Sequence, residues 1–128
     1  MKTRQSELLR VLGLLKDDLG DPQWVALVDE HGLVLMCIPD EPPVDIERVS
    51  AMTAALTISG ERVIGEIEGG LLRYVSVSGS QRQQLIVILN SKCVLSLGLD
   101  PVVSPRSTFK SLARWAPELL QILEKRID

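Results

Sequence analysis

The most constraining feature of this sequence is a short segment whose alternating positions are apolar on both sides. In residues 83–90, Leu85, Val87 and Leu89 alternate with Ile86 and Ile88, and residues 33–38 follow the same pattern. Successive side chains of a β-strand point to opposite faces of the sheet. A strand that is apolar on both faces has to be covered on both faces. The sequence therefore predicts a sheet lying between two layers of helices.

Hydrophobic periodicity and turn residues divide the rest of the chain into elements. Helices are predicted at 6–19, 44–68 and 108–126, and strands at 24–28, 33–38, 71–78, 83–90 and 93–99. Asp45 is predicted to be the N-cap of the middle helix, and Gly69 follows its end. The apolar stripe of the last helix continues across Pro117, which predicts either one kinked helix or two short ones. The fold class is thus α+β: helix, two strands, helix, three strands, helix, with a five-stranded antiparallel sheet.

Length and charge exclude several classes of protein. A chain of 128 residues with 45% hydrophobic side chains suits one domain over residues 1–128. The formal charge of −3 provides no basic field for phosphate backbones, so we expect no nucleic-acid partner. Apolar runs stay far below the ~20 residues of a membrane span, so membrane insertion is not expected. The N-terminus carries no signal-peptide pattern, which predicts a cytoplasmic location.

The sequence offers no positive sign of catalysis. It lacks a glycine-rich phosphate loop and a dinucleotide fingerprint, so neither cofactor nor nucleotide site is predicted. His31 lies in a turn beside Asp29, where solvation explains it better than general-base chemistry. Cys37 and Cys93 have no metal-ligand spacing and are predicted to be free thiols without a metal. We therefore expect a protein that is not an enzyme.

The middle helix has two different sides. The side assigned to the sheet contains Ile46, Val49, Met52, Leu56, Gly60, Val63, Ile64 and Ile67. Nearly opposite lie Ala51, Ala54, Ala55 and Ile58, bordered by Glu47, Arg48, Glu61 and Arg62. Small residues around one branched residue allow another helix to approach closely. The alternative is that alanine is simply a good helix former on a solvated side.

The width of the sheet favours a contact with a second helix over a solvated side. Five strands spaced ~4.8 Å apart span about 24 Å, whereas one helix covers only about 10 Å. One middle helix cannot cover that face, and a second copy from a partner protomer would complete the layer. Arg73, on an otherwise apolar set of the third strand, is predicted to mark a sheet edge or an interface.

These patterns together resemble the roadblock (dynein light chain) family. The resemblance rests on the hairpin 24–36, the long helix through Gly60 and the strands from Gln84 to Leu99, and it covers about residues 5–100. It implies a homodimer with the middle helices side by side and the sheets joined through their third strands. It implies no active site and a role as a platform for small Ras-like GTPases, as in gliding-polarity regulators that promote GTP hydrolysis by their partner. Residues 105–128 lie beyond the resemblance, as a C-terminal helical extension.

The family offers no catalytic motif to transfer, so the predicted interface rests on the exposed side of the middle helix and on the third strand. Its residues are Arg48, Ala51, Ala54, Ala55, Ile58, Arg62, Glu66 and Arg73. Two other functions remain open. One is a structural adaptor in a motor or signalling complex. The other is a small-ligand sensor, which would need a polar-lined cavity that strands this apolar do not favour.

Overall fold

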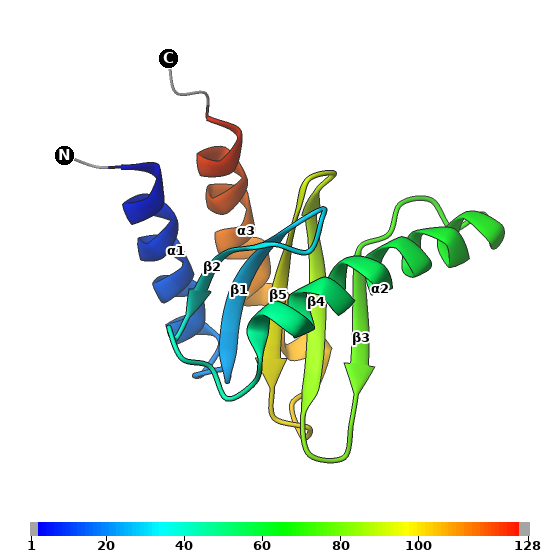
Figure 1. Ribbon diagram of the computed structural model, residues 1–128, viewed down its shortest axis with the longest axis horizontal. Helices are drawn as coiled ribbons and strands as arrows, with labels where there is room; N and C mark the ends of the chain where they lie inside the picture. The colour runs from blue at the N-terminus through cyan, green and yellow to red at the C-terminus, as the bar shows by residue number, and fades with distance from the viewer. Residues whose placement is uncertain (1–2, 126–128) are drawn as a thin grey trace.

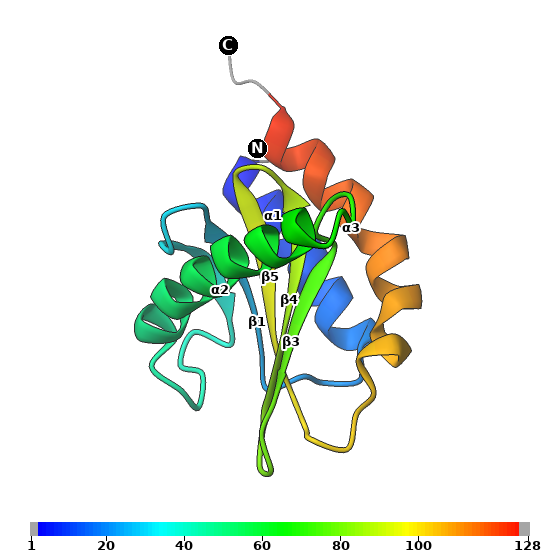
Figure 2. The same ribbon diagram turned by 90° about the vertical axis from the view of Figure 1, so that its right-hand side faces the viewer.

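A computed structural model describes residues 3–125 and forms three layers. Its elements are α1 (Arg4–Asp18), β1 (Trp24–Asp29), β2 (Val34–Ile38), α2 (Ile46–Glu66), β3 (Tyr74–Ser78), β4 (Gln83–Asn90), β5 (Cys93–Leu99), the 3-10 turn η1 (Pro105–Thr108) and α3 (Phe109–Glu124). The sheet order is β2-β1-β5-β4-β3, and all neighbours are antiparallel. Figures 1 and 2 show α1 and α3 side by side on one face of the sheet, with α2 alone across the other. The predicted α+β fold is confirmed.

The face under α1 and α3 holds the larger apolar core. Leu12 and Leu15 of α1, Leu119 of α3, and Leu85 and Leu97 of the sheet are fully buried there. Asp18 joins the two helices, because its carboxylate accepts hydrogen bonds from Arg114 (3.2 Å) and from the indole N–H of Trp115 (3.0 Å). α3 continues through Pro117 as a single helix, and its predicted end at residue 126 lies outside the described residues.

The β1–β2 hairpin is shaped by its turn and by a bulge. One carboxylate oxygen of Asp29 accepts from the backbone N–H groups of His31 and Leu33, both at 2.9 Å. Gly32 has φ +84°, and a Cβ there would lie 2.9 Å from the Cα of Ala51. The turn therefore packs directly on α2, an approach that only glycine permits at this φ. The strand register shifts between Leu27 and Val28, which marks the bulge.

The third strand is shorter than predicted. β3 begins at Tyr74 rather than Leu71, although the Arg73 carbonyl still accepts from Ile88 N–H at 3.0 Å. Glu68 and Gly70 have positive φ, so the chain turns sharply after α2 and Leu71 is 90% exposed. The apolar residues thus begin in the loop before β3, so their pattern does not show at which residue strand pairing starts.

The predicted sheet-facing side of α2 needs a correction. Ile46, Val49 and Leu56 pack against the sheet as expected, but Met52, Val63 and Ile67 are 57%, 58% and 65% exposed. The residues of α2 that are fully buried are polar, Ser50 and Thr53. The helix is therefore rotated relative to the side that hydrophobicity alone would choose, and part of its apolar surface faces outward.

Candidate functional site

The orientation of α2 is fixed by a buried hydrogen-bond network. The side-chain amide of Gln84 on β4 donates to the hydroxyls of Thr53 (2.8 Å) and Ser96 (2.9 Å). Thr53 in turn donates to the Val49 carbonyl at 2.8 Å, and the indole N–H of Trp24 donates to Ser96 at 3.0 Å. Because Thr53 faces the sheet, the side chains of Met52 and Val63 have to point away from it. This network explains why the apolar positions of α2 are divided between two directions.

Trp24 also depends on a glycine in the neighbouring strand. Trp24 and Gly98 are paired across β1 and β5, and a Cβ on Gly98 would lie 2.1 Å from the indole ring. No side chain fits in that space. The indole therefore lies flat over the Gly98 backbone with its N–H directed at Ser96, which holds the centre of the α2-covered face in one arrangement.

The residues predicted for the interface occupy three places. Ala51, Ala55, Arg48, Arg62 and Glu66 are exposed along the outer side of α2. Ala54 is half-buried, and its methyl group would lie 3.3 Å from a Cβ on Gly32. Ala51 and Ala54 therefore have a reason to be small within the chain itself, since the hairpin turn approaches them. Ile58 and Arg73 lie further along, where α2 crosses the edge of the sheet.

The exposed apolar residues of α2 form a strip, which we call the apolar flank and define as Met52, Ala55 and Val63. At ~100° per residue, Met52 and Val63 lie within about 20° of each other around the helix. Gly60 contacts Leu72 and Val75 beside the edge strand, so Val63 and Ile67 lie beyond it. Figure 1 shows α2 extending past β3. Val77 of β3, 45% exposed, shares a face with Gln84 and thus with α2.

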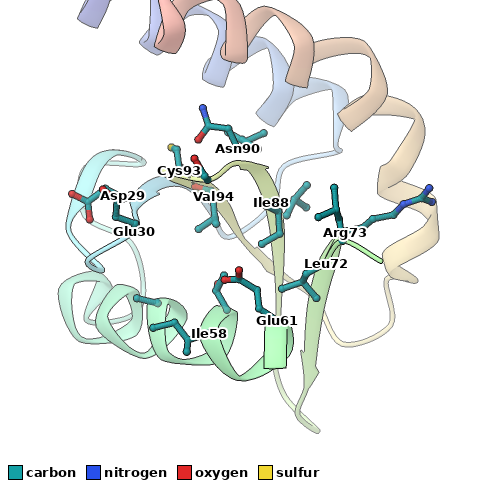
Figure 3. A pocket seen from close by; sticks show the side chains of 16 residues that line it. Asp29, Glu30, Ile58, Glu61, Leu72, Arg73, Ile88, Asn90, Cys93 and Val94 are labelled. Atoms are coloured by element: carbon teal, nitrogen blue, oxygen red, sulfur yellow. Dashed lines mark hydrogen bonds between the residues drawn. The ribbon is translucent and has the colours of Figure 1, made fainter. Parts of the chain in front are cut away.

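A groove of about 800 Å³ lies on the opposite flank of α2. Its lining comes from α2, the loop before β3, the ends of β4 and β5 and the β1–β2 turn, and Figure 3 shows these elements surrounding it. Ile58, Leu72, Ile88 and Val94 supply apolar surface, and Glu61 rises from α2 toward the sheet. The Arg73 side chain points away from the groove.

The groove brings together some of the predicted residues and omits others. Ala54, Ile58 and Arg73 line it, whereas Arg48 and Glu66 do not. Sequence reasoning placed Glu61 only at the border of a helix contact, and it did not find Glu30 or Leu72. These residues come from separate elements and share no linear motif, so the sequence offers no signal that would have grouped them.

Two cysteines of residues 3–125 have raised pKa values. Burial and, to a smaller extent, the neighbouring Asp29 carboxylate raise the pKa of the Cys93 thiol to about 11. Burial also raises the pKa of Cys37, with Asp40 contributing. Both thiols are free within the described chain. A thiol with a raised pKa is a weak nucleophile, so neither environment favours thiol chemistry.

Residues 3–125 contain neither a candidate metal centre nor a helix that could span a membrane. They contain no group of three or more His, Cys, Asp or Glu side chains arranged to hold a metal ion. Their helices also include none long and apolar enough to cross a membrane. A second hollow of about 300 Å³ lies between β3 and α3, where the rings of Tyr74 and Phe109 meet edge to face at 5.1 Å.

Comparisons with known proteins agree on the fold. Residues 11–97 match the family described as Roadblock/LC7 domain. Myxococcus xanthus MglB superimposes with a TM-score of 0.82 at 19% identity, covering 93% of this chain and 96% of that one. The gliding protein mglB from Thermus thermophilus gives 0.83 at 14%, covering 98% and 95%. A Roadblock/LC7 domain from Streptomyces avermitilis gives 0.79 at 15%, covering 91% and 97%. No curated protein sequence matches this chain.

Proposed function

The chain belongs to the Roadblock/LC7 family, and on that premise we propose that it is a homodimeric, non-enzymatic regulator of a small Ras-like GTPase. The observation that carries the proposal is the uncovered side of α2, which leaves Met52 and Val63 more than half exposed beside charged neighbours. Exposed apolar residues that gather on one side of a helix mark an interaction surface. The likeness of the fold to the MglB gliding proteins supports a regulatory role rather than a catalytic one.

The first partner we assign to this side is a second copy of the chain. The last turn of α2, which contains Val63, extends past β3, where a second β3 pairing with the first would lie beneath it (Figure 1). β3 is an edge strand with no neighbour on its outer side among residues 3–125. Pairing there would satisfy its open backbone groups and bury the apolar flank together with Val77. The apolar flank shares only Ala55 with the interface that was predicted from the sequence.

The dimer contact can be tested with a charge in the apolar flank. Val63→Glu places a carboxylate at a position that is 58% exposed in one protomer, so the protomer should remain folded. Buried and unpaired in a dimer, the same charge is costly. We expect the dissociation constant in analytical ultracentrifugation to rise at least about tenfold. The matched control is Leu9→Glu on α1, also half-exposed, which should leave the dimer unchanged. An unaltered Val63→Glu dimer would place the interface elsewhere.

The second partner is the GTPase, which we assign to the outer side of α2. Arg48 and Arg62 border its exposed small residues, and such a border sets association rate and orientation more than affinity. We expect the dimer to bind a purified Ras-like GTPase encoded in the same genome more tightly with a non-hydrolysable GTP analogue than with GDP. We also expect it to accelerate phosphate release from GTP. No binding in either nucleotide state would refute the function.

The role of the two arginines has its own variant. The double reversal Arg48→Glu, Arg62→Glu should weaken GTPase binding in a salt-dependent way while the dimer persists. Reversal of the exposed Arg106 in η1 is the matched control. A change within about twofold, which is only ~0.4 kcal/mol, would remove these arginines from the interface. Sedimentation of the same samples separates loss of GTPase binding from loss of the dimer.

A further inference from the structure

The groove between α2 and the ends of β4 and β5 has no role in the dimer contact proposed above. We propose that it receives a segment of the GTPase in which an apolar side chain stands next to a lysine or arginine. This inference rests on the proposed function and adds the place and chemistry of the contact. Ile58 connects the groove with the outer side of α2 that we assign to the GTPase, because it is exposed on that side and also lines the groove.

The interior of the groove suits an apolar anchor. Its volume of about 800 Å³ lies within the range of roughly 300–1,000 Å³ that binding pockets occupy. In Figure 3, Leu72 and Ile88 lie together at the right of the groove, with Ile58 below and Val94 above. Binding hot spots are often large side chains, Trp, Tyr and Arg above all, that enter such desolvated pockets. A large apolar side chain from a partner would occupy part of this space, and the segment that carries it would cover the rest.

The charges at the edge of the groove select a basic neighbour for that anchor. Asp29, Glu30 and Glu61 line it, and Arg73, the one basic lining residue among residues 3–125, turns away. Asp29 uses one oxygen within its turn, and Glu30 lies 3.6 Å from the His31 ring. The Glu61 carboxylate forms no ion pair or hydrogen bond with any residue of the described chain. Its carboxylate can therefore accept a partner's cation without breaking an existing contact.

The groove and the apolar flank lie on different sides of α2. Ala54, a lining residue, and Val63, in the flank, are nine positions apart, which is roughly 180° around the helix. A second copy bound along the flank leaves the groove open. The exposed Ile67 of a second copy is a poor occupant of the groove, because it stands between Glu66 and Glu68. Acidic residues beside that anchor would meet the acidic edge of the groove.

The test compares two charge reversals at exposed glutamates. The probe is the purified GTPase from the same genome, loaded with a non-hydrolysable GTP analogue. Glu61→Lys should weaken binding about tenfold and reduce its dependence on salt. Glu118→Lys on α3, across the sheet, is the matched control and should bind like the wild type, since its ion pair with Arg10 is long and exposed. Reversal of one basic residue on the GTPase should restore binding to Glu61→Lys.

The outcomes separate this inference from the function on which it rests. If the wild-type dimer binds no GTPase in either nucleotide state, the function falls and the inference falls with it. If the wild type binds and Glu61→Lys binds within twofold of it, the groove is not the contact and the function stands. If Glu61→Lys sediments as a monomer, the groove belongs to the contact between copies, and the inference is overturned.

Discussion

The two faces of the sheet are covered in different ways. Beneath α1 and α3, two helices bury a continuous apolar cluster, and the polar contacts lie at its margin, where Asp18 joins the helices. Across the other face a single helix is held by Gln84, Thr53 and Ser96 and keeps Met52 and Val63 exposed. Apolar burial makes the first face stable. Hydrogen bonds on the second face fix the orientation of α2. The first face therefore stabilises the fold, and the second keeps an apolar surface exposed.

The largest difference between the faces should come from removing apolar side chains. Leu15→Ala empties a fully buried position under α1, and such truncations cost about 2–5 kcal/mol of unfolding free energy. Met52→Ala, at a position 57% exposed, should change the unfolding free energy of the protomer by less than about 0.5 kcal/mol. Urea unfolding at low protein concentration measures both. Equal losses would mean that the faces do not differ as described.

The hydrogen-bond network should matter next. Gln84→Ala removes the amide that donates to Thr53 and Ser96 and leaves buried hydroxyls with fewer partners. Loss of a buried partner costs about 1–3 kcal/mol. Because this network orients α2, the variant should also weaken dimerisation. Gln81→Ala, an exposed glutamine in the β3–β4 turn, is the control. A Gln84→Ala protein with wild-type stability and dimerisation would show that the network does not hold α2.

The polar contact on the covered face should have a smaller effect. Asp18→Asn keeps the shape of the side chain but removes the charge that accepts from Arg114 and Trp115. We expect a loss of about 1 kcal/mol, since a partly exposed charged contact contributes modestly. Thermal unfolding at low and high salt would measure it, and salt should narrow the difference from wild type. A loss as large as that of Leu15→Ala would contradict an apolar basis for this face.

The smallest effect concerns the reactivity of the two thiols. With a pKa of about 11, the Cys93 thiol stays neutral at pH 8, and it is buried against the α1/α3 cluster. Cys37 is half-buried beside the α2 face and should react first with a water-soluble disulfide reagent. Because the unfolded thiol ionises near pH 9 and the folded one only near pH 11, the free energy of unfolding is constant below about pH 9 and falls as the pH rises toward 11. Equal reaction rates at pH 8 in the folded protein would contradict this order.

Local patterns in the sequence predict most of this fold. The five strands, the three helices, the Asp45 cap and the hairpin turn at Gly32 follow from periodicity, capping and turn residues, which are local properties. Contacts between distant elements are not local. The partners of Thr53 and Ser96 depend on where β4 lies beneath α2, so the exposure of Met52 and Val63 could not be read from hydrophobicity.

The candidate site was predicted only in part, for the same reason. The exposed side of α2, with Arg48 and Arg62, follows from helical spacing. The small size of Ala51 indicated a helix contact, but the hairpin turn at Gly32 accounts for it within one protomer. The groove is formed where four separate elements meet around Glu61, and their residues share no spacing in the sequence from which this contact could be predicted.

The bulge between Leu27 and Val28 bears on how far assembly can proceed. Its extra residue, Leu35, lies in β2, one margin of the sheet, and Pro39 follows that strand, so strand addition is hindered at this end. The other margin, β3, can pair with a copy of itself about a two-fold axis, and that pairing occupies the β3 margin of both copies at once. A molecule with one usable margin terminates at two copies, whereas a sheet with two would polymerise into fibres. In the proposed dimer, the irregular strand would thus limit the stoichiometry at a site far from the contact itself.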